Sequence, residues 1–479
     1  MSLKQKTISG VVWSFVEAVL LKGLSFVAML LLARWLGPID FGLMGMIAVF
    51  IGIGSSLVDS GMSSSIIRTK NADDEDFSTV FYMNMIISVI VYSILFFTAP
   101  YISSFYGQEV LINIIRIYCL TFIISAFSAV QLAILTKEMR FKRLTLLNIP
   151  STIIGATVGL TLGYNDYGVW SIVAMLLTTQ LVISILLWIN STWRPSLNFS
   201  KKKLKYHYNF GYKIMLSGLL DSIFMNSYNV LIGKFFPVQT LGYFERAKQF
   251  SDYPSVNITR IIRKVTYPML AQLQDDTPRL SIIYRKLLRI TFFIIAPLML
   301  GGAALAKPLF ELILGPIWLD AVPFFQILSI AAMLYPIHAF NINVLQVYGR
   351  SDLFLKLEII KKLFLAIGIA IGIQFGVIGL VWSIVFTSFI SLLINTHYSS
   401  KLIEYSTKRQ LTDMFPILLL AGLTYLLMYY SVYLMMDYSN IIQIAFASLI
   451  GLTFYLVIHS FFRASPIYAL ITIIKNRKL

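Results

Sequence analysis

Residues 241–267 read Leu-Gly-Tyr-Phe-Glu-Arg-Ala-Lys-Gln-Phe-Ser-Asp-Tyr-Pro-Ser-Val-Asn-Ile-Thr-Arg-Ile-Ile-Arg-Lys-Val-Thr-Tyr. The stretch is long enough to cross a bilayer as a helix, yet it carries cations where neighbouring segments carry leucine. On a helix of ~100° per residue, five polar side chains share a sector of roughly 60°. They are Arg246, Tyr253, Asn257, Arg260 and Lys264. Because a charge at the bilayer centre costs at least ~2.5 kcal/mol, we expect this stripe to face an aqueous cavity enclosed by protein.

A second interpretation of the stripe is that its two end cations extend toward opposite membrane surfaces. Long basic side chains can bury their stems in lipid and keep their charge in water. Arg246 and Lys264 are far enough apart for this arrangement. It leaves Asn257 and Arg260 unexplained, so we favour the cavity.

The composition is that of a polytopic membrane protein. Of 479 residues, 58% are hydrophobic and 13% are charged, about half the charged fraction of an ordinary soluble domain. The formal net charge of +17 does not predict a nucleic-acid partner, because the cations stand in short connections between apolar segments, where they orient the chain. The single cysteine, Cys119, lies in an apolar segment, which excludes a disulfide framework and a cysteine-based metal site within the chain.

With ~20 residues per span, the apolar pattern predicts about fourteen transmembrane helices. They are expected at 9–33, 41–64, 77–103, 111–135, 144–164, 168–190, 212–236, 242–267, 287–311, 321–346, 354–375, 377–398, 413–436 and 440–462. With both termini in the cytoplasm, most basic residues of the connections fall on the cytoplasmic side, which supports this count and orientation. A count of twelve or thirteen is the alternative, since 242–267 is polar and the two segments after residue 353 almost merge.

Two pairs of similar motifs indicate an internal repeat. Gly168-Val-Trp-Ser-Ile-Val173 opens the sixth span and Gly379-Leu-Val-Trp-Ser-Ile-Val385 the twelfth, while 34–42 and 234–242 follow the first and seventh. Both pairs are six spans apart, so we expect two six-helix lobes related by a pseudo-twofold axis along the membrane normal. The predicted organisation is an N-terminal lobe (1–195), a basic cytoplasmic linker (196–211), a C-terminal lobe (212–400), a C-terminal helix pair (412–462) and an interfacial cytoplasmic tail (463–479).

Motifs for catalysis or nucleotide binding are absent from the sequence. There is no Walker loop, no dinucleotide fingerprint, no Gly-x-Ser-x-Gly elbow and no His-Glu-x-x-His, and the four histidines are scattered, so we expect neither an enzyme nor a bound cofactor or metal. Functional candidates are therefore ionisable residues at membrane depth. The acids Glu17, Asp59 and Asp221 are candidates for coupling to H⁺ or Na⁺, although Asp59 also lies on a face of small residues suited to helix packing.

The charges of the two predicted lobes differ in sign. Acids lie on the first lobe and the cations of 242–267 on the second, so a cleft lined by both favours an anionic, hydrogen-bonding ligand beside titratable carboxylates. The predicted ligand-binding residues are Arg246, Arg260, Lys264, Asn257, Tyr253 and Lys22.

Five stretches along the chain give it a family resemblance. They are 33–42 (Ala-Arg-Trp-Leu-Gly-Pro-Ile-Asp-Phe-Gly), 241–247 (Leu-Gly-Tyr-Phe-Glu-Arg-Ala), 267–273 (Tyr-Pro-Met-Leu-Ala-Gln-Leu), 314–323 (Leu-Gly-Pro-Ile-Trp-Leu-Asp-Ala-Val-Pro) and 345–353 (Leu-Gln-Val-Tyr-Gly-Arg-Ser-Asp-Leu). With them the chain resembles the polysaccharide flippases of the multidrug/oligosaccharidyl-lipid/polysaccharide exporter (MOP) superfamily, in particular the branch exporting O-antigen, capsule and teichuronic acid. One departure is Phe236-Pro237 in place of a Gly-Pro turn in the second repeat.

The resemblance implies a flippase that moves an undecaprenyl-diphosphate-linked oligosaccharide repeat unit across the bacterial inner membrane by alternating access. Its implied partners are the lipid-linked oligosaccharide and membrane lipids, with a polysaccharide polymerase and glycosyltransferases as possible further partners. The diphosphate needs fixed cations and the sugar needs a wet polar cleft, which agrees with the polar stripe. The alternative is a cation-coupled drug or metabolite antiporter of the same superfamily, which would need a cleft rich in acids and aromatic rings.

Overall fold

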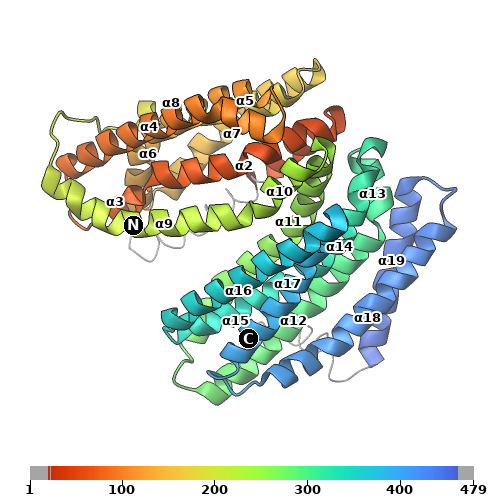
Figure 1. The fold of residues 1–479 in the computed structure, drawn as a ribbon. Helices are drawn as coiled ribbons and strands as arrows, with labels where there is room; N and C mark the ends of the chain where they lie inside the picture. The colour runs from red at the N-terminus through yellow and green to blue at the C-terminus, as the bar shows by residue number, and fades with distance from the viewer. Residues whose placement is uncertain (1–19, 22, 462–479) are drawn as a thin grey trace. The chain divides into compact units, whose positions relative to one another are not determined.

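A computed structural model of the chain describes residues 20–21 and 23–461, without the side chains of Ile261, Lys264 and Val265. The regular structure of these residues is entirely helical (Figure 1). Ten helical stretches are long and apolar enough to cross a membrane, which confirms the all-α polytopic class. Such helices suit lipid because they satisfy their backbone hydrogen bonds internally. Three of the ten contain more than one helix, namely Leu111–Lys137, Pro316–Val347 and Ser351–Ser399, and the count of fourteen spans stays a prediction.

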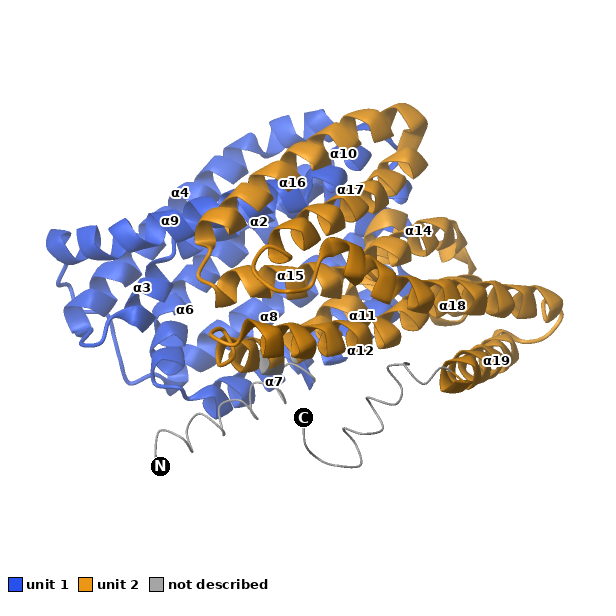
Figure 2. Ribbon diagram, turned by 90° about the horizontal axis from the view of Figure 1, so that it is seen from below, with its two compact units in different colours: residues 1–242 blue, residues 243–479 orange. Residues whose placement is uncertain are grey.

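The chain forms two compact units, residues 1–242 and 243–479 (Figure 2). The described part of the first unit begins with a short apolar helix at Gly23–Trp35. The further helices of this unit are α2 (Pro38–Asp59), α3 (Met62–Arg68), α4 (Asp74–Tyr106), α5 (Leu111–Tyr118), α6 (Leu120–Lys137), α7 (Phe141–Tyr164), α8 (Val169–Asn190), α9 (Lys201–Met225) and α10 (Ser227–Phe235). Helix α11 (Val238–Ala271) begins in the first unit and continues in the second. The predicted lobes were divided by the repeat, whereas packing groups α9 and α10 with α2, α3 and α4.

The second unit contains a long central helix and two helix pairs. Its helices are α12 (Thr277–Ala304), α13 (Ala306–Ile313), η1 (Pro316–Ala321), α14 (Val322–Ala332), α15 (Tyr335–Val347), α16 (Ser351–Gly372), η2 (Ile373–Phe375), α17 (Gly376–Ser399), α18 (Thr407–Leu434) and α19 (Asn440–Phe461). Helix α12 packs against α14 and α18, while α16 pairs with α17 and α18 with α19. Tyr284, Phe292 and Phe340 are fully buried in the core around α12. The predicted tail after residue 462 lies outside the described residues.

Equivalent glycines of the predicted repeat make reciprocal contacts where α2 and α11 begin. A Cβ atom on Gly42 would lie 2.1 Å from the carbonyl oxygen of Val238, and one on Gly242 would lie 1.9 Å from the carbonyl oxygen of Pro38. Only glycine permits so close an approach of two backbones. Each glycine therefore faces the first helical residue of the other motif, as a two-fold relation between the two helix starts would require.

A buried polar cluster ties α9 to α3 and α4 in the first unit. The His207 ring is 0% exposed, and its Nε2 lies 3.1 Å from Asp76 Oδ1 and its Nδ1 2.8 Å from Ser65 Oγ. Because a carboxylate only accepts, His207 Nε2 donates to Asp76. Lys203, one turn earlier on α9, forms ion pairs with Asp73 and, at 3.3 Å, with Asp76. We call Ser65, Asp73, Asp76, Lys203 and His207 the His207 cluster.

Candidate functional site

Helix α11 is the polar helix expected from residues 241–267, and it is longer than predicted. Its 34 residues give it a length of ~51 Å, and it contains Pro254 and Pro268. It is not among the ten long apolar stretches. A helix of this composition is tolerated at membrane depth only where protein or water covers its polar groups.

The stripe residues of α11 have different surroundings along the helix. Arg246 is buried, with 8% of its surface exposed, whereas Arg260 is exposed. Asn257 Nδ2 donates to the carbonyl oxygen of Tyr253 at 2.7 Å, so its amide bonds to its own helix. Arg246 and Arg260 are separated by ~21 Å along the axis, which is too far for one diphosphate to contact both. The side chain of Lys264 lies outside the described residues.

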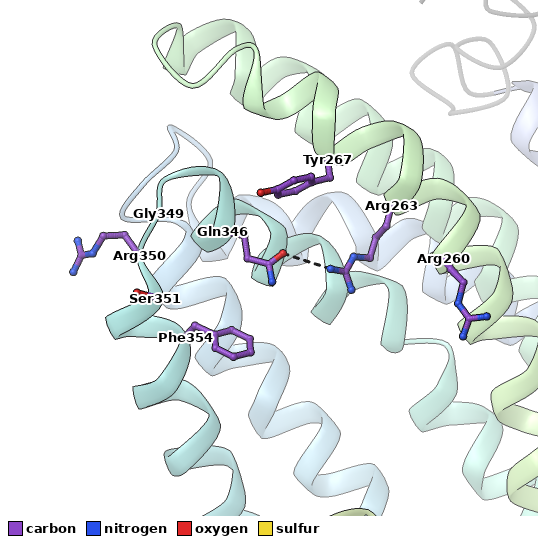
Figure 3. Close-up of a pocket in the computed structure, with 8 residues that line it drawn as sticks. All are labelled: Arg260, Arg263, Tyr267, Gln346, Gly349, Arg350, Ser351 and Phe354. Carbon is purple, nitrogen blue, oxygen red and sulfur yellow. Dashed lines mark hydrogen bonds between the residues drawn. The ribbon is translucent and has the colours of Figure 1, made fainter. Parts of the chain in front are cut away.

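A cavity of about 770 Å³ in the second unit lies between the C-terminal half of α11, the end of α15 and the start of α16 (Figure 3). It is lined by Arg260, Arg263, Tyr267, Gln346, Gly349, Arg350, Ser351 and Phe354. Figure 3 shows the side chain of Arg263 extending from α11 toward Gln346 on α15, with the Phe354 ring of α16 on the opposite side. We call this cavity the arginine pocket.

The arginine pocket carries more positive charge than its neighbouring acids neutralise. Arg263 Nη2 donates to Gln346 Oε1 at 3.4 Å, a neutral partner. Arg350 is paired through two nitrogens with Asp352, at 2.9 and 2.7 Å, and Figure 3 shows its side chain turned away from the cavity. Among the described residues, neither Arg260 nor Arg263 forms an ion pair with a carboxylate. Two planar guanidinium groups suit an anion with several oxygens, such as a phosphate or diphosphate.

Sequence reasoning found one of the residues of this pocket and missed its neighbours. Arg260 was predicted from the stripe, but Arg263 falls about 100° from Arg246 on the helix and so lies off the stripe. Its spacing of three residues from Arg260 puts the two side chains on adjoining positions, a signal that was available. Gln346 and Arg350 belong to the 345–353 motif, which was identified by resemblance and not as part of a site.

The predicted ion-coupling acids that the structure describes both lie in the first unit. Asp59 ends α2 and Asp221 lies on α9, and both are exposed. Helices α2 and α9 pack together, with Ser56 Oγ 3.3 Å from Ser222 Oγ. Glu17 and Lys22 lie outside the described residues. Nowhere in 20–21 and 23–461 do three or more His, Cys, Asp or Glu side chains gather as a metal site would require.

Comparison with known proteins places these features in context. A family model described as polysaccharide biosynthesis protein matches residues 31–323. The lipopolysaccharide biosynthesis protein WzxC of Escherichia coli K12 is 24% identical over 86% of this chain and 84% of its own length. The succinoglycan biosynthesis transport protein ExoT of Rhizobium meliloti is 24% identical over 69% of this chain and 67% of its own length. In fold, the chain is similar to the lipid II flippase MurJ in an inward closed conformation, with a TM-score of 0.74, 16% identity, and coverage of 95% of this chain and 98% of that one.

Proposed function

The chain belongs to the polysaccharide biosynthesis protein family, and from this membership we propose that it is a flippase for a lipid-linked oligosaccharide repeat unit in surface polysaccharide synthesis. Two relatives bear names that refer to lipopolysaccharide biosynthesis and to succinoglycan transport, which supports a polysaccharide role. Ten long apolar helices support transport across a membrane, and the protein acts by moving its substrate, without catalysis.

The observation that carries this proposal is the uncompensated charge of the arginine pocket. A sugar repeat unit built on a polyprenyl diphosphate presents several anionic oxygens at the junction of its polar and apolar parts. Arg260 and Arg263 lie three residues apart on α11 and can donate to these oxygens together, while Tyr267 and Phe354 give the pocket apolar walls. A cationic drug would be repelled there, which disfavours the antiporter alternative.

The proposed cycle is alternating access in the bacterial inner membrane with both termini in the cytoplasm. In this orientation the arginine pocket receives the diphosphate on the cytoplasmic side, and Arg246 lies farther along α11 and contacts the substrate at another stage. Lys408 lies in the first turn of α18, on the proposed cytoplasmic side. A cysteine introduced there, in a chain whose Cys119 is replaced, should react with an impermeant reagent only in inverted vesicles. A polymerase and glycosyltransferases are the proposed partners, because they use and supply the repeat unit.

Arg260→Ala, Arg263→Ala is the variant that tests this proposal. Each charge-assisted hydrogen bond contributes ~1.5–3 kcal/mol, so loss of either arginine should weaken diphosphate binding by about ten- to a hundredfold. Binding is measured on purified protein with undecaprenyl diphosphate, and undecaprenol serves as the uncharged comparison. The matched control is Arg279→Ala, an exposed arginine of α12 outside the pocket.

The cellular readout is surface polysaccharide in a flippase-null strain complemented with each variant, with membrane abundance measured in parallel. We expect the double variant to lose most export and the Arg279 variant to retain it. Arg260→Lys, Arg263→Lys should recover part of the binding, because lysine keeps the positive charge but lacks the planar guanidinium group that donates two parallel hydrogen bonds. Normal export by the double alanine variant at normal abundance would contradict the assignment of the pocket.

We further propose that a carboxylate of the first unit couples transport to H⁺ or Na⁺, with Asp59, Asp221 and Glu17 as candidates. The reason is that ionisable residues at membrane depth are costly enough to be retained mainly for function. Replacement by the corresponding amide keeps the shape and removes the charge. At least one of Asp59→Asn, Asp221→Asn and Glu17→Gln should lower export and reduce its dependence on pH or Na⁺. If all three replacements leave both properties unchanged, these carboxylates do not couple.

A further inference from the structure

A second cavity of the second unit, of about 620 Å³, differs from the arginine pocket in chemistry. It lies where α13 and the start of α14 face the end of α18 and the start of α19. Its volume is within the range of ~300–1,000 Å³ typical of small-molecule sites. Among its lining residues are Tyr429, Tyr433, Lys307, Glu311, Gln326 and Gln443, and we call it the tyrosine pocket.

The two cavities lie beside opposite ends of α12. Thr277 Oγ1, at the start of α12, is 3.4 Å from Tyr348 Oη, next to the Gln346 and Gly349 that line the arginine pocket. At the other end of α12, Ala304 lines the tyrosine pocket, and Gln326 Nε2 donates to the carbonyl oxygen of Ala303 at 3.1 Å. The 28 residues of α12 span ~42 Å, which matches the thickness of a bilayer with its headgroups. The pockets therefore lie toward opposite membrane surfaces.

Three exposed tyrosines line the tyrosine pocket: Tyr438, which follows α18, and two whose rings are one turn apart on α18. Tyr429 and Tyr433 are 50% and 58% exposed, and Tyr429 stacks on Tyr425 with ring centroids 5.8 Å apart. The hydroxyl groups of Tyr429 and Tyr433 take part in no hydrogen bond within the described chain. A fixed, exposed aromatic face binds the apolar face of a flat ligand at small entropic cost, since a tyrosine has only two rotatable side-chain torsions.

The polar part of the tyrosine pocket has balanced charge and free hydrogen-bonding capacity. Lys307 and Glu311 are four residues apart on α13, and the side chain of neither forms an ion pair or hydrogen bond with any described residue. Gln326 and Gln443 each donate through Nε2 to a backbone carbonyl, at 3.1 and 2.8 Å, which leaves the side-chain carbonyl oxygens as acceptors. One cation, one anion and two amide oxygens can serve a ligand rich in hydroxyl groups.

We infer that the tyrosine pocket binds the saccharide part of the transported molecule near the membrane surface opposite the arginine pocket. A sugar ring combines an apolar C–H face with a rim of hydroxyls, which matches stacked tyrosines beside unpaired donors and acceptors. The balanced charge argues against a diphosphate, which would be repelled by Glu311. This inference rests on the proposed function for the identity of its ligand. It adds a second binding position in the second unit, at the end of α12 opposite the arginine pocket.

The test measures saccharide binding separately from diphosphate binding. The probe is the set of free repeat-unit oligosaccharides released by mild acid hydrolysis from the surface polysaccharide of the strain that carries the gene. Saturation-transfer NMR and calorimetry on purified protein report their binding. The Tyr429→Ala, Tyr433→Ala variant should bind them at least tenfold more weakly than the parent, and Glu311→Gln several-fold more weakly.

Conservative and distant variants separate a binding role from a folding role. Tyr429→Phe, Tyr433→Phe keeps both rings and should retain most of the affinity. Tyr335→Ala removes an exposed tyrosine of the same unit that lines neither pocket and should bind as the parent does. Undecaprenyl diphosphate binding should be unchanged in all these variants, which distinguishes failure of this inference from failure of the proposed function.

Three results would overturn the saccharide site. They are absence of oligosaccharide binding by the parent protein, unchanged binding by the double alanine variant, and displacement of the oligosaccharides by phosphorylethanolamine. The last result would identify a phospholipid headgroup site, because that probe carries the charges of a lipid headgroup and no sugar ring.

Discussion

Replacement of His207 by alanine should destabilise the first unit, of which His207 is the single histidine. The ring is fully buried and bonds to Asp76 and Ser65 on two different helices. A hydrogen bond to a charged group contributes ~1.5–3 kcal/mol and a neutral one ~0.5–1.5 kcal/mol. In the variant, Asp76 keeps its ion pair with Lys203 and its hydrogen bond from the backbone N–H of Asp73, so its carboxylate still has hydrogen-bond partners. We therefore expect His207→Ala to lower the free energy of unfolding by about 2–4 kcal/mol.

The chain carries its own reporter for this measurement. Cys119 is its single cysteine and is 1% exposed in the first unit, so a fluorogenic maleimide reacts with it only when that unit opens. A loss of 2–4 kcal/mol corresponds to a fall in melting temperature on the order of 5–15 °C for a unit of this size. The temperature is measured in one detergent at one heating rate, because unfolding of membrane proteins is commonly irreversible.

The control and the refuting result are both defined by the structure. His397 is exposed in α17 of the second unit, and His397→Ala should change the melting temperature by no more than a surface substitution does. His207→Asn should recover part of the loss, because its amide can replace one of the two hydrogen bonds. A melting temperature for His207→Ala within 2 °C of the parent would show that the His207 cluster contributes no net stability.

Two further predictions concern the first unit: one tests the ion pair of Lys203 with Asp73, and the other tests the close contact between the first residues of α2 and α11. The hydrogen bond from Lys203 lowers the pKa of Asp73 to about 2. The lowered pKa stabilises the folded state above about pH 4, and this stabilisation is lost as the pH falls toward 2. Lys203→Ala should therefore make the melting temperature less dependent on pH between about pH 4 and 2. Gly242→Ala should lower the melting temperature, because its Cβ would lie 1.9 Å from the Pro38 carbonyl oxygen, whereas Gly422→Ala, on a helix with nothing within 4 Å, should leave it unchanged or raise it. Equal effects of the two glycine substitutions would refute the close contact.

The helices were predictable because hydropathy reports membrane burial directly, whereas their ends depend on local hydrogen bonds. The span expected at 77–103 is part of α4, which begins at Asp74. Its first turn is acidic and falls outside an apolar window, but Asp73 and Asp76 form a capping box that extends the helix to that point. A sequence window that scores only apolar character does not detect such a turn.

The site was less predictable because an angle on a helix does not say what packs against it. Arg246 and Arg260 share one angular sector, yet one is buried and the other lines an open pocket. The pocket around Arg260 is formed by residues 346–354, from the end of α15 to the start of α16, and the helical angle of Arg260 says nothing of these residues. Gln346 follows Arg263 by 83 positions in the chain, so only tertiary structure brings the two residues together.

The length of α11 explains how its C-terminal arginines can reach an anionic lipid headgroup at the membrane surface. The helix is ~51 Å long and the hydrocarbon core of a bilayer is ~30 Å thick, so about 10 Å projects at each end if the helix is centred. Arg260 is 11 residues from Ala271, or ~16 Å, which places its backbone about 6 Å inside the hydrocarbon boundary, and Arg263, at ~12 Å, is about 2 Å inside it. Their long side chains can extend along the helix toward the surface and bring the guanidinium groups to the boundary. Phosphates of membrane lipids lie just beyond this boundary. The two arginines are therefore at the depth where a polyprenyl diphosphate presents its charge, so the substrate can be bound before its headgroup leaves the membrane surface.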